Sequence, residues 1–96
     1  MAMKARETLG DDPELVQILG QIRYQKKEFV HAIQLLQASA RAKPLDANGL
    51  YYLGMSQMQT KQKPEALEAL NRALAAGLAD AQAAEAKRAV AELQRR

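Results

Sequence analysis

The feature that most constrains this chain is an internal repeat, in which residues 13–46 correspond to residues 47–80. When the two segments are aligned, the pair Leu19–Gly20 falls on Leu53–Gly54 with no gap, and we call this displacement the repeat offset. Matched glycines are harder to obtain by chance in a Leu- and Ala-rich chain than matched leucines. Periods of this length are typical of proteins in which one supersecondary unit stacks on the next. The same offset also pairs Ala32 with Ala66, Leu36 with Leu70 and Ser39 with Ala73.

Each copy contains two helical patterns separated by a polar break. In the first copy, the polar run Gln25–Glu28 precedes a stretch from Phe29 to Ala40 whose apolar residues recur at helical spacing. In the second copy, the break at Lys61–Pro64 precedes a similar stretch over residues 66–74. No window alternates apolar and polar residues with the period of a strand. The sequence therefore predicts an all-α fold of about four to five helices.

Helix start and stop signals fall at corresponding places in the two copies. Asp12 is expected to cap the helix that follows it, and Asp46 and Asp80 are expected to open the next two helices. Pro44 is expected to stop the second helix of the first copy. Gly77 is expected to end the second helix of the second copy in the left-handed cap conformation.

Small residues at matched positions predict close packing between the paired helices. A glycine inside a helix costs roughly 1 kcal/mol relative to alanine, so Gly20 and Gly54 need a compensating gain. The close approach of a partner helix is such a gain, because glycine has no Cβ. The same tight packing is expected at Ala32, Ser39, Ala66 and Ala73.

These residues carry a resemblance to a known family. A 34-residue helix–turn–helix unit with Leu-Gly in its first helix and two spaced small residues in its second resembles the tetratricopeptide repeat (TPR). The resemblance covers residues 13–80 and implies a TPR-like α-solenoid, a right-handed superhelix of antiparallel helix pairs. The chain departs from the family's pattern at Val16 and Leu50 (usually aromatic), Arg23 and Gln57 (usually Tyr), and Leu78 (often Pro).

The segments on either side of the two repeats continue the register, so we treat residues 1–96 as a single domain. Residues 3–10 fit the end of a partial preceding repeat, because Ala5 stands one repeat offset before Ser39. Residues 81–96 carry one apolar stripe and are expected to form a capping helix with one packed and one solvated face. We therefore expect the chain to be the C-terminal part of a longer repeat protein.

Composition argues against catalysis, a metal site or a cofactor. The chain has no Cys, which excludes a disulfide framework and thiolate chemistry. Its one His, His31, has no second His or Cys beside it and is expected to be a solvated residue near Glu28. No nucleotide-binding or zinc-protease motif occurs, and neither Ser39 nor Ser56 has a base nearby. We expect a protein that is not an enzyme.

Charge and hydropathy favour neither nucleic acid nor a membrane as the partner. The net charge of +3 makes the chain mildly basic. Four lysines lie at the two predicted turns between paired helices: Lys26, Lys27, Lys61 and Lys63. Turns are solvated and often Lys-rich, and base-stacking groups do not recur at matched positions. No apolar run has the ~18 residues that a membrane span needs. The lack of a signal-peptide core slightly favours the cytoplasm, without fixing the location.

The resemblance implies a function in protein–protein interaction. In this family the first helices line a groove that binds extended or helical segments of partner proteins. Helical spacing places one neutral stripe of amides, phenols and thioethers beside the packed Leu-Gly face, and such side chains suit an interface. The predicted groove residues are Gln17, Gln21, Tyr24, Asn48, Tyr51, Tyr52, Met55 and Met58.

Two alternatives stay open at this point. Tyr51, Tyr52 and Met55 are alternatively core residues, because aromatic stripes at helical spacing often serve packing. The chain is alternatively a structural segment that self-associates as a homodimer or caps a larger array. Leu15 and Val16, which lack a full preceding neighbour, would then lie exposed at the surface of association.

Overall fold

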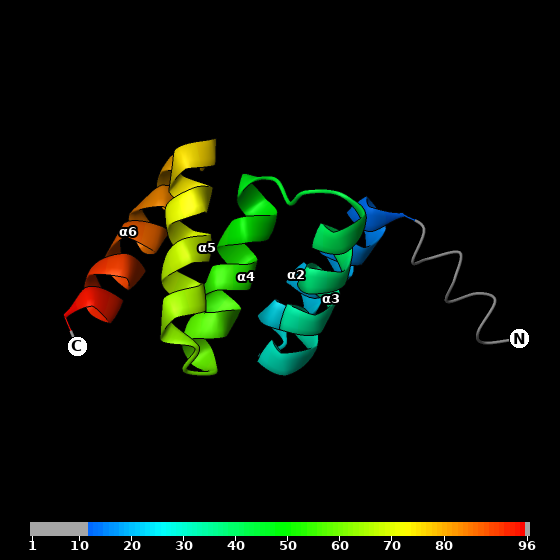
Figure 1. Cartoon of the computed structure of the whole chain (residues 1–96), viewed down its shortest axis with the longest axis horizontal. Helices are drawn as coiled ribbons and strands as arrows, with labels where there is room; N and C mark the ends of the chain where they lie inside the picture. Colours follow the sequence, from blue (N-terminus) through cyan, green and yellow to red (C-terminus); the bar gives the residue numbers. More distant parts are fainter. Residues whose placement is uncertain (1–11, 96) are drawn as a thin grey trace, which may run out of the picture.

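The protein is all α-helical over residues 12–95, which a computed structural model describes; residues 1–11 and 96 lie outside the described residues. The partial helix predicted over residues 3–10 therefore also lies outside them. The prediction of an all-α fold is confirmed, with five helices in the described part (Figure 1). They are α2 (Pro13–Gln25), α3 (Phe29–Ala42), α4 (Ala47–Gln59), α5 (Lys63–Ala76) and α6 (Asp80–Gln94).

The helices pack in chain order as antiparallel neighbours. We call α2 with α3 the first hairpin and α4 with α5 the second hairpin. The first hairpin lies at one end of the row and α6 at the other (Figure 1). In addition to its chain neighbours α3 and α5, helix α4 contacts α2 on one side and α6 on the other. Helix α4 is therefore the central element of the fold.

The two hairpins have the same backbone geometry when one is shifted onto the other by the repeat offset. The ends of α2 and α3 precede those of α4 and α5 by this offset at every terminus. The turns also correspond, because Lys27 and Lys61 both adopt a φ of 65°. The next residue in each turn donates a backbone hydrogen bond of 2.9 Å that closes the turn. Glu28 donates to the carbonyl of Arg23, and Gln62 donates to the carbonyl of Gln57.

The paired helices of each hairpin approach most closely at a glycine. A Cβ added to Gly20 would lie 2.7 Å from Cγ of Leu36, and one added to Gly54 would lie 2.6 Å from Cγ of Leu70. Both leucines are fully buried. The expectation that these glycines allow a close helix approach is confirmed. A methyl group at either position would overlap a side chain that has no free space to move into.

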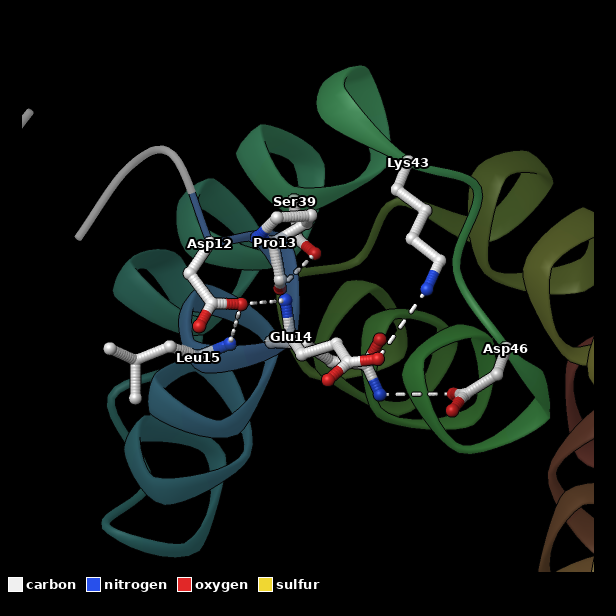
Figure 2. Close-up of polar contacts among 8 residues, drawn as sticks. Asp12, Pro13, Glu14, Leu15, Ser39, Lys43 and Asp46 are labelled. Carbon is white, nitrogen blue, oxygen red and sulfur yellow. Dashed lines mark hydrogen bonds and ion pairs between the residues drawn. The ribbon is translucent and has the colours of Figure 1, made fainter. Parts of the chain in front are cut away.

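Aspartates cap the first helix of each hairpin as predicted. Asp12 accepts hydrogen bonds from the backbone N–H groups of Glu14 and Leu15, at 3.1 and 3.3 Å (Figure 2). Asp46 accepts one at 2.9 Å from the N–H of Gly49. Its Oδ1 also accepts a bond at 2.9 Å from Nε2 of Gln17, so this cap links α4 to α2.

The other predicted helix ends lie at the expected places. Gly77 ends α5 with a φ of 100°, which confirms the left-handed cap. Helix α3 ends at Ala42, just before Pro44, as expected. Asp80 opens α6 as predicted, as its first helical residue, where its charge favours the helix dipole. The extended residue before the helix is Ala79, and no side chain caps α6.

The start of α2 is tied to the end of α3 by two polar contacts (Figure 2). The buried hydroxyl of Ser39 donates a hydrogen bond of 2.6 Å to the carbonyl of Pro13. Nearby, Nζ of Lys43 lies 3.4 Å from a carboxylate oxygen of Glu14. Ser39 is therefore a packing residue, as its small size predicts, and it also binds a backbone carbonyl at a helix start.

We expect Gly54→Ala to destabilise the protein despite its higher helix propensity. The propensity gain is about 1 kcal/mol, whereas overpacking a filled core costs about 1–3 kcal/mol, so the net loss should be on the order of 1 kcal/mol. Urea unfolding followed by far-UV circular dichroism measures this difference. The control is Asn71→Ala, at an exposed position of α5, which should be neutral or slightly stabilising. Equal stability of the Gly54 variant and the wild type would contradict the close approach.

We expect Asp46→Ala to cost more stability than Asp12→Ala. Both variants lose an N-cap worth about 1 kcal/mol. Only Asp46→Ala also loses the bond from Gln17, which should add a further few tenths of a kcal/mol. Thermal unfolding of the two variants under the same conditions gives the comparison. A larger loss for Asp12→Ala would mean that the Gln17 bond contributes nothing.

Candidate functional site

The predicted groove residues belong to α2 and α4, and the same register continues into α6. Helices α2, α4 and α6 follow one another in contact, and we call their shared surface the three-helix face. Glu85, Ala89 and Glu92 of α6 stand one repeat offset after Tyr51, Met55 and Met58 of α4. The site therefore has a third helix that the sequence-based prediction does not include, although the offset itself indicates it.

Two of the predicted groove residues belong to the packed core. Tyr51 is 8% exposed and Met55 is 6% exposed. They pack in one cluster with apolar residues of α5 and α6, which are Leu70, Ala73, Ala86 and Ala89. Tyr51 and Met55 therefore hold α6 against α4 and present little surface to a ligand. For these two residues, the packing alternative raised by the sequence describes their position.

The remaining predicted residues differ in how accessible they are. Gln17 is half-buried and engaged with Asp46 at the start of α4, so its amide links two helices. Asn48 is exposed. The half-buried residues are Gln21, Tyr24, Tyr52 and Met58.

The aromatic residues of the chain form one continuous cluster where the two hairpins meet. The ring of Tyr24 contacts those of Phe29 and Tyr52, with centroids 5.6 and 5.3 Å apart. The ring of Tyr52 contacts that of Tyr51 at 5.1 Å. Each pair is in the edge-to-face arrangement that aromatic quadrupoles favour. The cluster joins α2, α3 and α4, so the tyrosines fix one hairpin against the next.

The tyrosine hydroxyls lie in an environment that disfavours ionisation. Burial raises the pKa of Tyr51 to about 12, and the charges of Tyr24 and Glu85 add to the effect. The pKa of Tyr24 is also raised, first by burial and then by the negative charge of Glu85. The Glu85 carboxylate of α6 thus acts on phenols of both α2 and α4.

Three adjacent hollows cross the three-helix face and the turns beside it, with volumes of about 360, 430 and 400 Å³. Gln59 borders the first and second, and Met58 and Glu92 border the second and third, so the hollows run on from one another. We call them together the end groove. Its other lining residues are Tyr24, Gln25, Lys27, Phe29, Met55, Lys61, Lys63, Glu85, Arg88, Ala89 and Leu93.

The end groove combines an apolar floor with charged sides. Phe29, Met58 and Leu93 supply apolar surface, and the amides of Gln25 and Gln59 lie between them. On α6, Glu85, Arg88 and Glu92 follow one another at helical spacing along the side of the middle hollow. The sequence predicts a neutral lining, and it is neutral only on α2 and α4. The charges come from α6 and from the lysines of the two turns.

His31 occupies the position that the sequence predicts. Its side chain is 68% exposed, and its Nδ1 lies 3.6 Å from a carboxylate oxygen of Glu28. The same carboxylate forms a 2.9 Å ion pair with Arg23, and this bond is the main reason why the pKa of Glu28 is lowered. His31 lies outside the end groove.

Two comparisons of the sequence with known proteins give no match. No protein-family model matches the chain, and no curated protein is similar to it in sequence. Residues 12–95 contain no group of three or more His, Asp or Glu side chains that would hold a metal ion. None of the helices in this part of the chain is long and apolar enough to cross a membrane.

We expect Glu85→Gln to lower the pKa values of Tyr24 and Tyr51, because the neutral amide removes a negative charge that opposes their ionisation. Titration of tyrosinate absorbance at alkaline pH measures the change. The matched control is Glu68→Gln, at an exposed position of α5, which should leave the titration unchanged. An identical tyrosine titration in the wild type and Glu85→Gln would place Glu85 away from the phenols.

The raised pKa of Tyr51 also predicts a loss of stability at alkaline pH. The unfolded chain loses the phenolic proton near pH 10, whereas the folded chain keeps it up to about pH 12. Between these values the folded state binds more protons, so its stability falls as the pH rises. Urea unfolding at several alkaline pH values should show a smaller pH dependence for Tyr51→Phe. An equal slope for the two proteins would contradict the raised pKa.

Proposed function

We propose that this chain is a TPR-like helical repeat domain that binds a segment of a partner protein without catalysis. The segment lies in the end groove and contacts α2, α4 and α6 in turn. The observation that carries this proposal is the run of adjacent hollows across helices that occupy equivalent places in successive units. Surfaces of this kind, repeated along a stack of helix pairs, are the usual binding surfaces of repeat proteins.

The repeat assignment is supported by backbone geometry as well as by sequence. The two hairpins share their helix ends, and their turns share the φ of 65° at Lys27 and Lys61. Each hairpin also seats a buried leucine against a glycine of its first helix. We further propose that these hairpins are two copies of one unit in a right-handed superhelix, with α6 as a capping helix.

The chemistry of the end groove suits a peptide segment. Met58 has a flexible thioether side chain that adapts to different apolar partners. The amides of Gln25 and Gln59 are able to donate to and accept from a peptide backbone. Glu85, Arg88 and Glu92 of α6, together with the lysines of the lining, offer both signs of charge to polar groups of the ligand.

Selection from a phage-displayed random-peptide library tests this function. Clones that bind the wild-type protein should bind Met58→Glu at least about tenfold more weakly, because the new charge lies on the apolar floor. The control variant is Gln37→Glu, which changes an exposed residue of α3 outside the groove. Circular dichroism of both variants shows whether the fold is retained. Failure to select any clone, or equal binding to Met58→Glu and wild type, would reject the groove as the site.

Tyr51→Ala and Tyr52→Ala separate packing from binding in the aromatic cluster. Because Tyr51 is buried in the core, we expect Tyr51→Ala to cost about 3 kcal/mol or more of stability. The half-buried Tyr52 should cost less when truncated. Thermal unfolding gives both values, and peptide binding by the folded variants is measured alongside. A Tyr51→Ala variant as stable as the wild type would contradict the packing role of Tyr51 and favour a role in binding.

A further inference from the structure

The first hairpin has an apolar surface on the side facing away from the second hairpin. We call it the N-terminal face, formed by Leu15, Ile18, Leu19 and Ile22 of α2 with Leu35 and Ala38 of α3. Ile18 is 49% exposed and Ile22 is 40% exposed. The expectation that Val16 would be exposed here is wrong, because Val16 is 7% exposed. Val16 lies one helical turn before Gly20, on the stripe that packs against α3.

Part of the equivalent surface of the second hairpin is covered. The residues one repeat offset after Leu15, Ile22 and Leu35 are Gly49, Ser56 and Ala69, and all three are buried. Gly49 and Ser56 lie on α4, where the first hairpin packs, with both α2 and α3 in contact with α4. The fold itself therefore shows what covers such a face, which is the side of a helical hairpin. On the first hairpin the corresponding side chains are larger and more apolar, and they are half-buried or exposed.

The charges beside the N-terminal face select among the possible occupants. A hollow of about 490 Å³ lies between α2 and α3, lined by Arg23, His31, Gln34, Leu35, Ala38 and Arg41. The charge of Arg23 is balanced by Glu28 at 2.9 Å. Arg41 forms no ion pair within the described residues, so this rim is positive. A second copy of the chain would bring its own positive rim to the interface, whereas an acidic partner helix would supply the opposite charge.

We propose that the N-terminal face binds an amphipathic α-helix of a partner protein that carries acidic residues beside its apolar stripe. The stripe packs on Ile18, Ile22 and Leu35, and a carboxylate of the partner pairs with Arg41. This helix takes the place that α3 takes on α4. The proposal is independent of the end groove, because the two surfaces share no residue.

Binding of synthetic helical peptides tests the proposal. The probe is a 14-residue peptide, the length of α3, with Leu and Ala in an apolar stripe and Glu on both sides of it. A second peptide has the same stripe flanked by Lys. Isothermal titration with the full chain should detect the Glu peptide and give at least about tenfold weaker binding for the Lys peptide. Absence of Glu-peptide binding, or equal binding of both peptides, would overturn the proposal.

Variants assign any binding to the N-terminal face. Ile22→Glu should weaken Glu-peptide binding by about tenfold or more, because it places a charge within the apolar stripe. Val30→Glu is the matched control, since Val30 is a 61% exposed aliphatic residue of α3 outside this face. Arg41→Glu should remove or reverse the preference for the Glu peptide. Equal weakening by the Ile22 and Val30 variants would contradict the assignment, with circular dichroism confirming that each variant is folded.

Light scattering tests the rival occupant. If the N-terminal face binds an acidic partner helix, the wild-type chain alone should have the molar mass of a monomer at all concentrations. A concentration-dependent dimer that Ile22→Glu abolishes would show that a second copy covers the face, and would overturn the proposal in favour of self-association. Met58→Glu in the end groove should leave Glu-peptide binding unchanged. This last measurement keeps a failure of the end groove distinct from a failure of the N-terminal face.

Discussion

The close approach of paired helices at a glycine is the interaction on which the rest of the structure depends. In each hairpin, a fully buried leucine occupies the space that a Cβ would fill, at Gly20 and at Gly54. This contact sets both the distance between the helices and their register along the axis. Because the contact is the same in both hairpins, each presents a similar side to its neighbour. The contacts of α4 with α2 and α6, and hence the three-helix face, follow from that similarity.

Most of the fold is predictable from the sequence, because the two copies carry local signals that act alone. Helix periods, the caps at Asp12 and Asp46, and the left-handed Gly77 all depend on a few neighbouring residues. Asp80 opens α6 as predicted but does not cap it, because the connection after Gly77 leaves Ala79 extended and Asp80 already helical. A shift of one residue changes the role of an aspartate from cap to first-turn charge. Periodicity alone does not determine helix ends to within one residue.

The candidate site is less predictable, because helical spacing gives the direction of a side chain but not what covers it. Tyr51 and Met55 belong to the predicted groove, yet they are buried in the core, where they pack against the small side chains of Ala86 and Ala89 of α6. The contribution of Glu85 escapes prediction for the opposite reason. Its register position is available from the sequence, but polar residues of a capping helix are expected to be solvated. Only tertiary packing places that carboxylate beside two phenols.

The gathering of every aromatic ring at one place also determines how this protein responds to light. The chain has no Trp, and its three Tyr residues all lie where the two hairpins meet. Its near-ultraviolet emission therefore comes from the contact between the two hairpins. It does not report on structural changes at either end of the row of helices. Separation of the two hairpins would change the tyrosine emission even if the individual helices stayed folded. Intrinsic fluorescence and backbone ellipticity thus monitor separate events in the same molecule.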